Sequence, residues 1–382
     1  MFRMECKKTL LSWTFWIYVA VLLLEGYTQL GKEFQKIEAP QPGLERYGIK
    51  YVDDSELIMK EATASLIAEF EANAYIAYPP PLLIYKNVKL SEAKQAEIQA
   101  IGAQLTDGQP SYERFKELMK QADKLIGGGS KYAVSNLADF GETDKTYEDA
   151  LAEFNAIVDK DRITGALARY FCDYFGFVLA VFPVFVAVAL GLKDRRTRMR
   201  ELVYSRRVSS LTVVFVRYAA LVAMMFLPVL LFAGYFTVQT AGDYTGDSID
   251  RLAFFKYSLG WLLPSLMCST AVGVFLTVLT ETPIAIAVQG LWWFIDTNRG
   301  VKHIYGGYGA DLAIRHNTIG NTEVFLQHLD TLMINRIGYT MLSLVLVGAA
   351  AGVYELKRRG KLHGPNFRLA NIFVHRKVQS EA

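Results

Sequence analysis

The stretch from Tyr218 to Gly242 reads YAALVAMMFLPVLLFAGYFTVQTAG, and none of its 25 residues is charged. A helix needs about 20 consecutive apolar residues to cross the hydrocarbon layer of a membrane, so this stretch predicts a membrane span. Three other long uncharged runs predict further spans: Tyr174–Leu192, Tyr257–Thr280 and Ile337–Tyr354. Together they indicate an integral membrane protein rather than a self-contained soluble enzyme.

Two shorter apolar runs complete the predicted set. Thr9–Leu24 resembles a secretory signal peptide in length, but it is rich in Trp and Tyr and lacks a small-residue cleavage site, so a retained first span is favoured. Thr282–Ile295 ends in Trp292 and Trp293, and aromatic residues favour the membrane interface. A tilted or re-entrant helix could use this run. We therefore expect six spans, or five if the short run does not cross.

Charge predicts the orientation of these spans. The segment Lys193–Ser210 holds seven Lys or Arg and two acidic residues, and the chain from Glu355 to its end holds seven and two. Segments rich in Lys and Arg stay in the cytoplasm. The segment Gly31–Leu167 holds 16 basic and 23 acidic residues, which fits the opposite side. We expect a multi-pass protein of the cell membrane with both termini in the cytoplasm.

The predicted fold is an all-α integral membrane protein with a mostly helical extracytoplasmic domain. Its expected parts are the N-terminus and first span (1–30), the extracytoplasmic domain (31–167), spans two to six (168–356) with a cytoplasmic coupling loop at 193–210, and a basic cytoplasmic tail (357–382).

Within the extracytoplasmic domain, polar residues mark helix starts at Asp54–Ser55, Ser91, Ser111 and Thr146. The last of these helices has apolar residues on one face, and we expect Phe154 to be buried inside the domain. Residues 82–88 alone look strand-like, and residues 32–51 are expected to form an irregular linker. The three cysteines lie in or beside predicted spans, so a disulfide framework is not expected in the domain.

A search for catalytic patterns gives little. The five His residues show no metal-ligand spacing, and His316 and His328 are better explained as solvated or structural. Gly127-Gly128-Gly129 lacks the spacing of a phosphate-binding loop and is better explained as a helix-ending turn. We therefore expect no catalytic residue, no metal site and no cofactor-binding site in this chain. The basic segments are explained by topology, so no nucleic acid partner is expected.

The basic loop contains the most informative motif, Arg200-Glu-Leu-Val-Tyr-Ser-Arg206. It resembles the loop between the second and third spans of ABC-2-type transporter permeases, in which a Glu-Leu-Leu-x-Ser-Arg-Pro-like run forms a coupling helix on the ATPase. Glu201, Leu202, Ser205 and Arg206 match, whereas Arg207 replaces the common Pro. The resemblance implies that Met199 and Arg200 also belong to the residues that couple the permease to the ATPase. The amphipathic helix that precedes the first span in this family is hardly present, since only eight residues precede Thr9.

The resemblance implies a permease subunit of a bacterial exporter that moves a peptide, lipid or antibiotic-like substrate. ATP and Mg²⁺ would bind a separate cytoplasmic ATPase subunit, and the chain would form a homodimer or a heterodimer within membrane lipid. A domain between the first two spans is similar to that of the ABCA-class lipid exporters. The alternative is a membrane-bound sensor or scaffold whose outer domain binds an envelope ligand.

Polar residues and prolines inside the predicted spans are the other candidates for function. Charged groups are costly in lipid and usually face an interior or a cavity, although Arg217 could instead snorkel to the cytoplasmic surface. Proline removes a backbone hydrogen bond and can kink a span. The candidate polar or hinge residues are Asp173, Pro183, Arg217, Pro228, Pro264 and Gln289.

Overall fold

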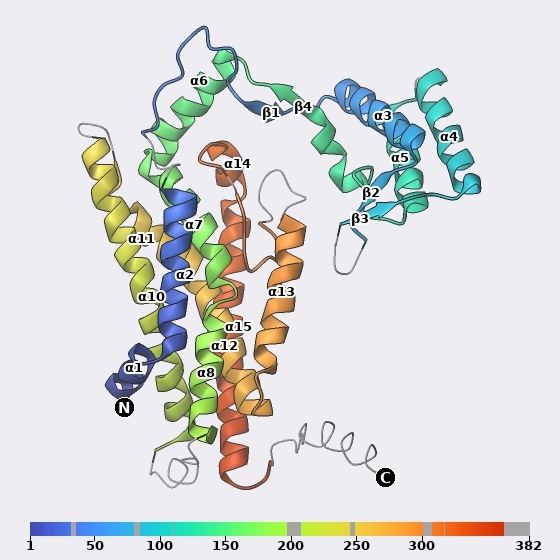
Figure 1. The fold of residues 1–382 in the computed structure, drawn as a ribbon. Coiled ribbons are helices and arrows are strands. Elements are labelled where there is room, and N and C mark those ends of the chain that lie inside the picture. The colour runs from blue at the N-terminus through green and yellow to red at the C-terminus, as the bar shows by residue number, and fades with distance from the viewer. Residues whose placement is uncertain are drawn as a thin grey trace, which may run out of the picture.

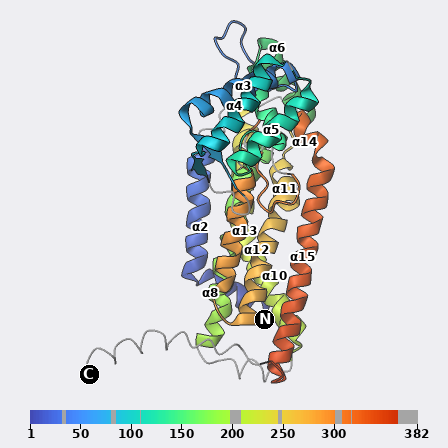
Figure 2. The same cartoon turned by 90° about the vertical axis from the view of Figure 1, so that its right-hand side faces the viewer.

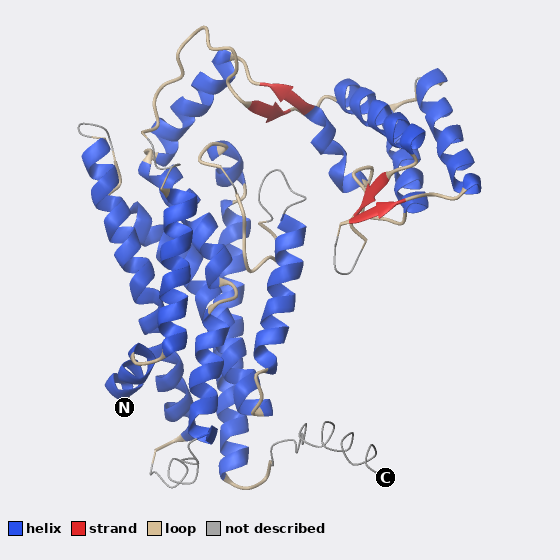
Figure 3. Ribbon diagram, viewed as in Figure 1, coloured by secondary structure: helices blue, strands red, loops and turns tan. Residues whose placement is uncertain are grey.

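The computed structural model shows a bundle of long helices with a smaller unit carried beyond one end (Figure 1). We call this the domain end and the other the basic end. Helices dominate, and short strands lie in the smaller unit and its connection (Figure 3). The structure describes residues 1–31, 36–79, 85–108, 110–196, 208–244, 249–300, 308–316 and 318–362.

The bundle is built from helices on both sides of the smaller unit in the sequence. They are α1 (Phe2–Leu10), α2 (Trp13–Glu25), α7 (Thr164–Leu179), α8 (Pro183–Arg196), α10 (Ser210–Asp243), α11 (Ala253–Tyr257), α12 (Leu263–Thr280), α13 (Ile284–Gly300), α14 (Thr322–Gln327) and α15 (Leu329–Arg358). Single π-helical turns follow α2 (η1, Gly26–Leu30), precede α7 (η3, Ile157–Asp161) and join α11 to α12 (η4, Ser258–Leu262).

Among the described residues, four helical segments are long and apolar enough to cross a membrane. They are Thr164–Lys193, Ser210–Asp243, Ala253–Thr280 and Leu329–Arg358. A fifth arises if the bent pair Phe2–Leu10 and Trp13–Leu30 counts as one span. The predicted sixth span corresponds to α13, which has 17 residues, at the short limit for a span, and lies alongside the other helices (Figure 1). Six spans therefore remain a prediction.

The N-terminal residues form a helix that the sequence analysis did not expect. Helix α1 has nine residues and meets the following helical segment at 67°. It packs against α10, where Glu5 Oε1 lies 3.8 Å from Arg217 Nε. The expectation that no helix would precede the first span is therefore wrong, because Phe2–Leu10 is long enough to form two turns and to pack on the bundle.

At the basic end, residues next to the basic loop lie beside the C-terminal helix α15. Arg358 Nη1 donates to the carbonyl of Val208 at 2.8 Å. Lys357 Nζ donates to the carbonyl of Val278 at 2.7 Å and forms an ion pair with Glu281 at 2.8 Å. The N-terminus and the end of α15 lie at this end as well (Figure 1). The described residues at the edges of the two basic segments, 193–196 with 208–210 and 355–362, thus lie at one end of the bundle.

Helices α8 and α12 pack closely through small residues. A Cβ added to Gly273 would lie 2.8 Å from Ala187 Cβ, and one added to Gly191 would lie 2.9 Å from Thr277 Cγ2. Small residues at such positions let helix backbones approach each other, which is how membrane helices gain packing contacts. The centre of the bundle therefore depends on these two glycines.

The smaller unit, which we call the domain unit, has its own apolar core. It comprises α3 (Ser55–Ala72), β2 (Tyr75–Ala77), β3 (Lys86–Val88), α4 (Glu92–Asp107), α5 (Tyr112–Ile126) and the 3₁₀ segment η2 (Val134–Gly141). The predicted helix starts are confirmed, since Asp54, Ser91 and Ser111 precede α3, α4 and α5, and the Asp54 side chain accepts hydrogen bonds from Glu56 N and Leu57 N. Strands β2 and β3 form an antiparallel pair, of which the sequence predicts only β3.

An arm of two antiparallel strands, β1 (Ile49–Tyr51) and β4 (Glu142–Asp144), carries the domain unit. The strand β1 corrects the prediction of an irregular linker over 32–51, because residues 49–51 find a partner about 90 positions later. Figure 1 shows the domain unit displaced to one side of the bundle axis, and Figure 2 views the molecule from that side. The arm therefore connects two separate bodies.

Helix α6 (Tyr147–Ala156) stands between the arm and the bundle and has no fully buried side chain. The expectation that Phe154 would be buried inside the domain is wrong, since this residue is half-buried and lies outside the core of the domain unit. The following residues Ile157, Ile163 and Leu167 belong to the bundle core. The predicted range 31–167 thus includes the domain unit and part of the bundle.

Candidate functional site: a polar cluster between the arm and the bundle

A non-helical segment, which we call the inserted segment (308–320), packs among the helices at the domain end. Asn317 lies outside the described residues. The inserted segment has three buried apolar residues, Leu312, Ala313 and Ile314. A non-helical backbone inside a membrane bundle requires partners for its N–H and C=O groups, and these come from polar side chains on surrounding helices.

Arg169 of α7 is the centre of this arrangement, and its side chain is fully buried. Its Nη2 lies 2.7 Å from Asp161 Oδ2 and 2.9 Å from the carbonyl oxygen of Ile319. Its Nη1 donates to the carbonyl of Gly320 at 3.0 Å, and the guanidinium lies 5.0 Å from the centre of the Phe325 ring. One buried cation therefore holds η3, α14 and the inserted segment together.

His316 is a structural member of the cluster. Arg169 Nη1 lies 2.8 Å from His316 Nε2, and arginine can only donate, so Nε2 is the acceptor. Nδ1 contacts the Tyr308 hydroxyl, and Nε2 also lies 3.1 Å from the carbonyl oxygen of Gly320, so the ring is held on both sides. Tyr308 also stacks on His328, with ring centres 5.0 Å apart. This supports the structural interpretation of both histidines.

Asp173, one of the predicted polar residues, lies one turn beyond Arg169 on α7 and is fully buried. Its Oδ1 accepts from the backbone N–H of His316 at 2.8 Å and from Arg315 Nε at 3.1 Å. The Arg315 guanidinium packs over the rings of Tyr174 and Phe177. Asp173 therefore anchors the inserted segment to span two.

Arg336 of α15 and Asp296 of α13 hold the other side of the inserted segment. Arg336, 4% exposed, donates to the carbonyls of Asp311 and Leu312 and to Ser265 Oγ. Asp296 Oδ2 accepts from the backbone N–H of Leu312 at 2.8 Å. The inserted segment is thus fixed by side chains from four helices, α7, α12, α13 and α15.

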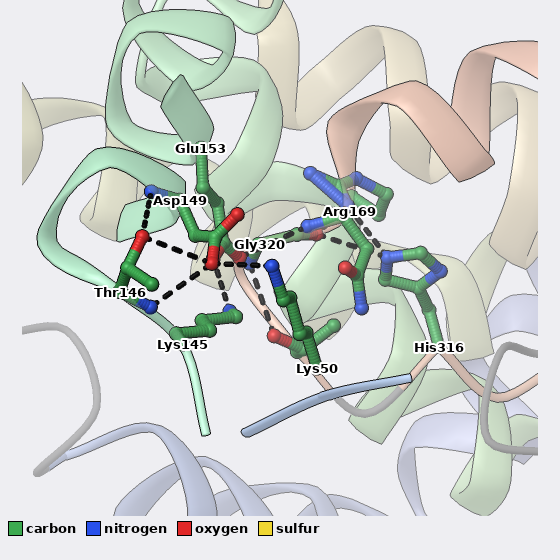
Figure 4. Close-up of polar contacts among 10 residues, drawn as sticks. Lys50, Lys145, Thr146, Asp149, Glu153, Arg169, His316 and Gly320 are labelled. Atoms are coloured by element: carbon green, nitrogen blue, oxygen red, sulfur yellow. Dashed lines mark hydrogen bonds and ion pairs between the residues drawn. The ribbon is translucent and has the colours of Figure 1, made fainter. Parts of the chain in front are cut away.

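The cluster continues into the arm (Figure 4). Glu153 of α6 accepts from the backbone N–H of Asn321 at 3.2 Å and is paired with Lys145, which follows β4. A Cβ on Gly320 would lie 1.5 Å from Glu153 Oε1, so only glycine allows this approach. A continuous set of polar contacts therefore runs from the arm through Gly320 to Arg169.

A second ion pair fixes α6 to the arm. Lys50 of β1 lies 2.5 Å from Asp149, which also forms a capping box with Thr146 at the start of α6. The hydrogen bonds from Lys50 and from the Thr146 backbone lower the pKa of the Asp149 carboxyl. Asp149 therefore stays ionised near neutral pH and keeps both contacts.

Pro183 and Gln289, predicted independently, meet at a break in span two. Helix α7 ends at Leu179 and α8 begins at Pro183, whose missing N–H interrupts the hydrogen-bond ladder. Val184 N–H donates to Val181 instead of Ala180, and Gln289 Nε2 donates to the free carbonyl of Ala180 at 2.6 Å. One turn later, Trp293 Nε1 donates to the carbonyl of Phe177 at 3.0 Å. Helix α13 thus supplies donors to the broken segment of its neighbour.

The remaining predicted residues lie apart from the polar cluster. Arg217 lies at the basic end, 25% exposed, close to Glu5, and therefore faces α1. Pro228 lies inside the continuous helix α10. Pro264 is in the first turn of α12, directly after the π turn η4. The predicted coupling residues Met199, Arg200, Glu201, Leu202, Ser205 and Arg206 lie outside the described residues.

The arrangement offers contacts rather than a reaction centre. Within the described ranges, no three His, Cys, Asp or Glu side chains are placed to hold a metal ion. The buried charges are engaged with backbone groups or with each other, which suits a structural and mechanical role.

Comparison with protein families decides what kind of protein carries this bundle. The family model described as ABC-2 family transporter protein matches residues 8–295, about three quarters of the chain. The chain belongs to the ABC-2 transporter family. This confirms the resemblance seen in the basic loop. The chain is thus the membrane component of an ABC-2 transporter, and its family is not itself catalytic. No similar curated protein and no similar solved structure was found.

Proposed function

We propose that this chain is the permease subunit of an ATP-binding-cassette exporter and works as a homodimer or heterodimer. The observation that carries the proposal is the match to the ABC-2 family over residues 8–295, which includes the basic loop. ATP and Mg²⁺ bind cytoplasmic ATPase subunits, and the substrate crosses the membrane through the bundle.

The mechanism follows from how the helices are connected. ATPase subunits contact residues 199–206, between α8 and α10, and movement there shifts both helices. Helix α8 joins α7 at the Pro183 break, and α7 carries Arg169 and Asp173. Movement at the basic end therefore reaches the inserted segment and the arm through span two. The domain unit lies outside the cytoplasm and responds to, or guides, the leaving substrate.

The first prediction tests the partnership. When the full chain is co-expressed with an ABC ATPase encoded beside it, we expect the two to purify together. The complex should hydrolyse ATP in lipid nanodiscs, and the chain alone should not. A chain that purifies without any ATPase, while its outer domain binds an envelope ligand, would instead support the sensor or scaffold hypothesis.

The second prediction tests the orientation. A cysteine at Gln99, exposed on α4, should react with a membrane-impermeant maleimide added to intact cells, whereas one at Lys361 should react only after lysis. The background requires Cys6→Ser, because Cys172 and Cys268 are buried. The reverse labelling pattern would invert the proposed topology.

A further inference from the structure

A well-formed cavity in the described chain adjoins the polar cluster and shares Asp161, Phe325 and Arg336 with it. It has a volume of about 740 Å³ and opens between the start of α7, the α11–η4–α12 segment and α15. This size is within the range of about 300–1,000 Å³ that holds small ligands in proteins.

The cavity is lined by cations from the start of span two and by apolar residues from η4 and α15. At its mouth are Lys160 and Arg162, just before Thr164, where span two begins. Its apolar lining includes the buried Trp261 and Leu332 and the exposed Ile337. The cavity therefore offers cations at the level of lipid headgroups and an apolar groove at the level of acyl chains.

The charges that line the cavity do not cancel. Asp161 is neutralised by Arg169, and Asp250 is paired with Lys256 at 2.6 Å. Arg162 is exposed and forms no ion pair with any residue that the structure describes. Lys160 contacts Glu323 only on the surface, where both side chains are about half exposed and such pairs are weak.

Arg336 adds a third positive charge at the buried side of the cavity. It donates to carbonyl, hydroxyl and amide oxygens, and no carboxylate of the described segments lies within ion-pair distance of it. Because Asp161 and Asp250 are each paired with a cation, the remaining charges that line the cavity are positive.

The backbone at the mouth is strained in a way that fixes Arg162. Arg162 and Ile163 both have positive φ, 55° and 53°. Ile163 has ψ of −58°, and Thr164 N–H donates to the carbonyl of Arg162, which closes a three-residue turn. This conformation is unfavourable for a β-branched residue and persists only where surrounding contacts enforce it. Strained backbone of this kind is enriched at ligand sites.

We propose that this cavity binds an anionic lipid from the surrounding bilayer, with its headgroup at Arg162 and Lys160 and an acyl chain along α15. The inference deepens the proposed function, and depends on it only for the role of the lipid as cargo or regulator. Binding itself needs neither ATP nor the ATPase, so the two proposals can fail separately.

The test uses the full chain in phosphatidylcholine nanodiscs that contain a small fraction of photoreactive lipid. Phosphatidylglycerol and phosphatidylcholine carrying the same diazirine acyl chain are compared, and labelled peptides are located by mass spectrometry. We expect phosphatidylglycerol to label the peptide containing 329–337 about tenfold more than phosphatidylcholine at equal mole fraction. High salt should reduce this preference, because the headgroup contacts are exposed.

Two sets of variants sharpen the test. Lys160→Gln with Arg162→Gln should remove the preference and leave phosphatidylcholine labelling unchanged; both side chains are exposed, so folding should be retained. Met333→Trp should block the cavity to both lipids, whereas Ile334→Trp, the neighbouring exposed position outside the cavity, should not.

Equal labelling by the two lipids, unaffected by the charge variants, would show non-selective contact with bulk lipid and overturn the proposal. Efficient cross-linking of Met333→Cys between two chains would also overturn it, because the groove would then be an interface between copies.

Discussion

Replacing Arg169 with methionine is expected to lower the free energy of unfolding by about 3–5 kcal/mol, the usual effect of removing one partner from a buried ion pair. The reason is that the carboxyl group of Asp161, 7% exposed, would lose the cation that compensates it inside the bundle. The hydroxyl of Thr322, which donates to Asp161 at 2.7 Å, cannot replace that charge. The carbonyls of Ile319 and Gly320 would lose their donor as well. The measurement is thermal unfolding of the purified chain in detergent.

Two further variants test whether the loss of stability comes from the uncompensated carboxyl group of Asp161. Lys160→Met removes a cation of the exposed pair with Glu323 and should change stability by about 0–1 kcal/mol. Adding Asp161→Leu to Arg169→Met should restore part of the loss, because no uncompensated charge remains. If Arg169→Met melted like Lys160→Met, the assignment of Arg169 as the centre of the cluster would be wrong.

Replacing Gly141 with alanine is expected to open the arm. A Cβ at this position would lie 2.1 Å from the carbonyl oxygen of Val52, an atom of the backbone that no side-chain rotation can move. The same two residues are joined by the hydrogen bond from Val52 N to Gly141 O at 2.9 Å. Overpacking typically costs about 1–3 kcal/mol, and here relief requires the strands to separate.

Hydrogen exchange of the full chain measures this directly. Amides of β1 and β4 should lose protection in Gly141→Ala, while those of α10 keep theirs. Gly102→Ala is the control, because nothing lies within 4 Å of a Cβ at Gly102 and alanine favours a helix. Unchanged protection of the strands in Gly141→Ala would show that the close contact with Val52 does not exist in solution.

The positions of the membrane helices could be predicted from uncharged runs, but their lengths could not. Helix α7 begins at Thr164, ten residues before the predicted run at Tyr174, and α15 spans Leu329–Arg358 rather than Ile337–Tyr354. The helical turns outside the predicted runs contain Arg169, Asp173 and Arg336, and the charge of each of these residues ends an uncharged run. These residues are tolerated because their charges meet partners inside the bundle rather than lipid.

The polar cluster was missed for the same reason. Asp173 borders an apolar run and is predictable for that reason, whereas Arg169, one turn earlier, does not border the run. The spacing of Arg169 and Asp173 on one helix face was the available signal. Their partners His316 and Gly320 lie about 150 residues away, and periodicity along the chain contains no information about contacts over that distance. The Pro183 break was predictable, but the donor from Gln289 was not.

The domain unit shows the limit of local patterns in another way. Helix caps at Asp54, Ser91 and Ser111 depend on neighbouring residues and could be predicted. The amphipathic face of α6 could be recognised too, but not the body against which it lies. Pairing of β1 with β4 closes a long loop, and a three-residue strand has too short a pattern to be identified alone.

The central claim is that this permease transmits ATP hydrolysis through its basic loop, and the variant Glu201→Lys with Leu202→Asp tests it most directly. A matched control, Lys361→Glu with Leu356→Asp, makes the same kind of changes on exposed residues at the basic end of α15. Both variants should insert and fold like the wild type. Losing one partner of a buried charged contact costs about 2–5 kcal/mol, so the loop variant should lose the ATPase on purification and lose substrate-stimulated hydrolysis in nanodiscs, while the control keeps both. Normal complex formation and normal stimulated hydrolysis in the loop variant would contradict the account.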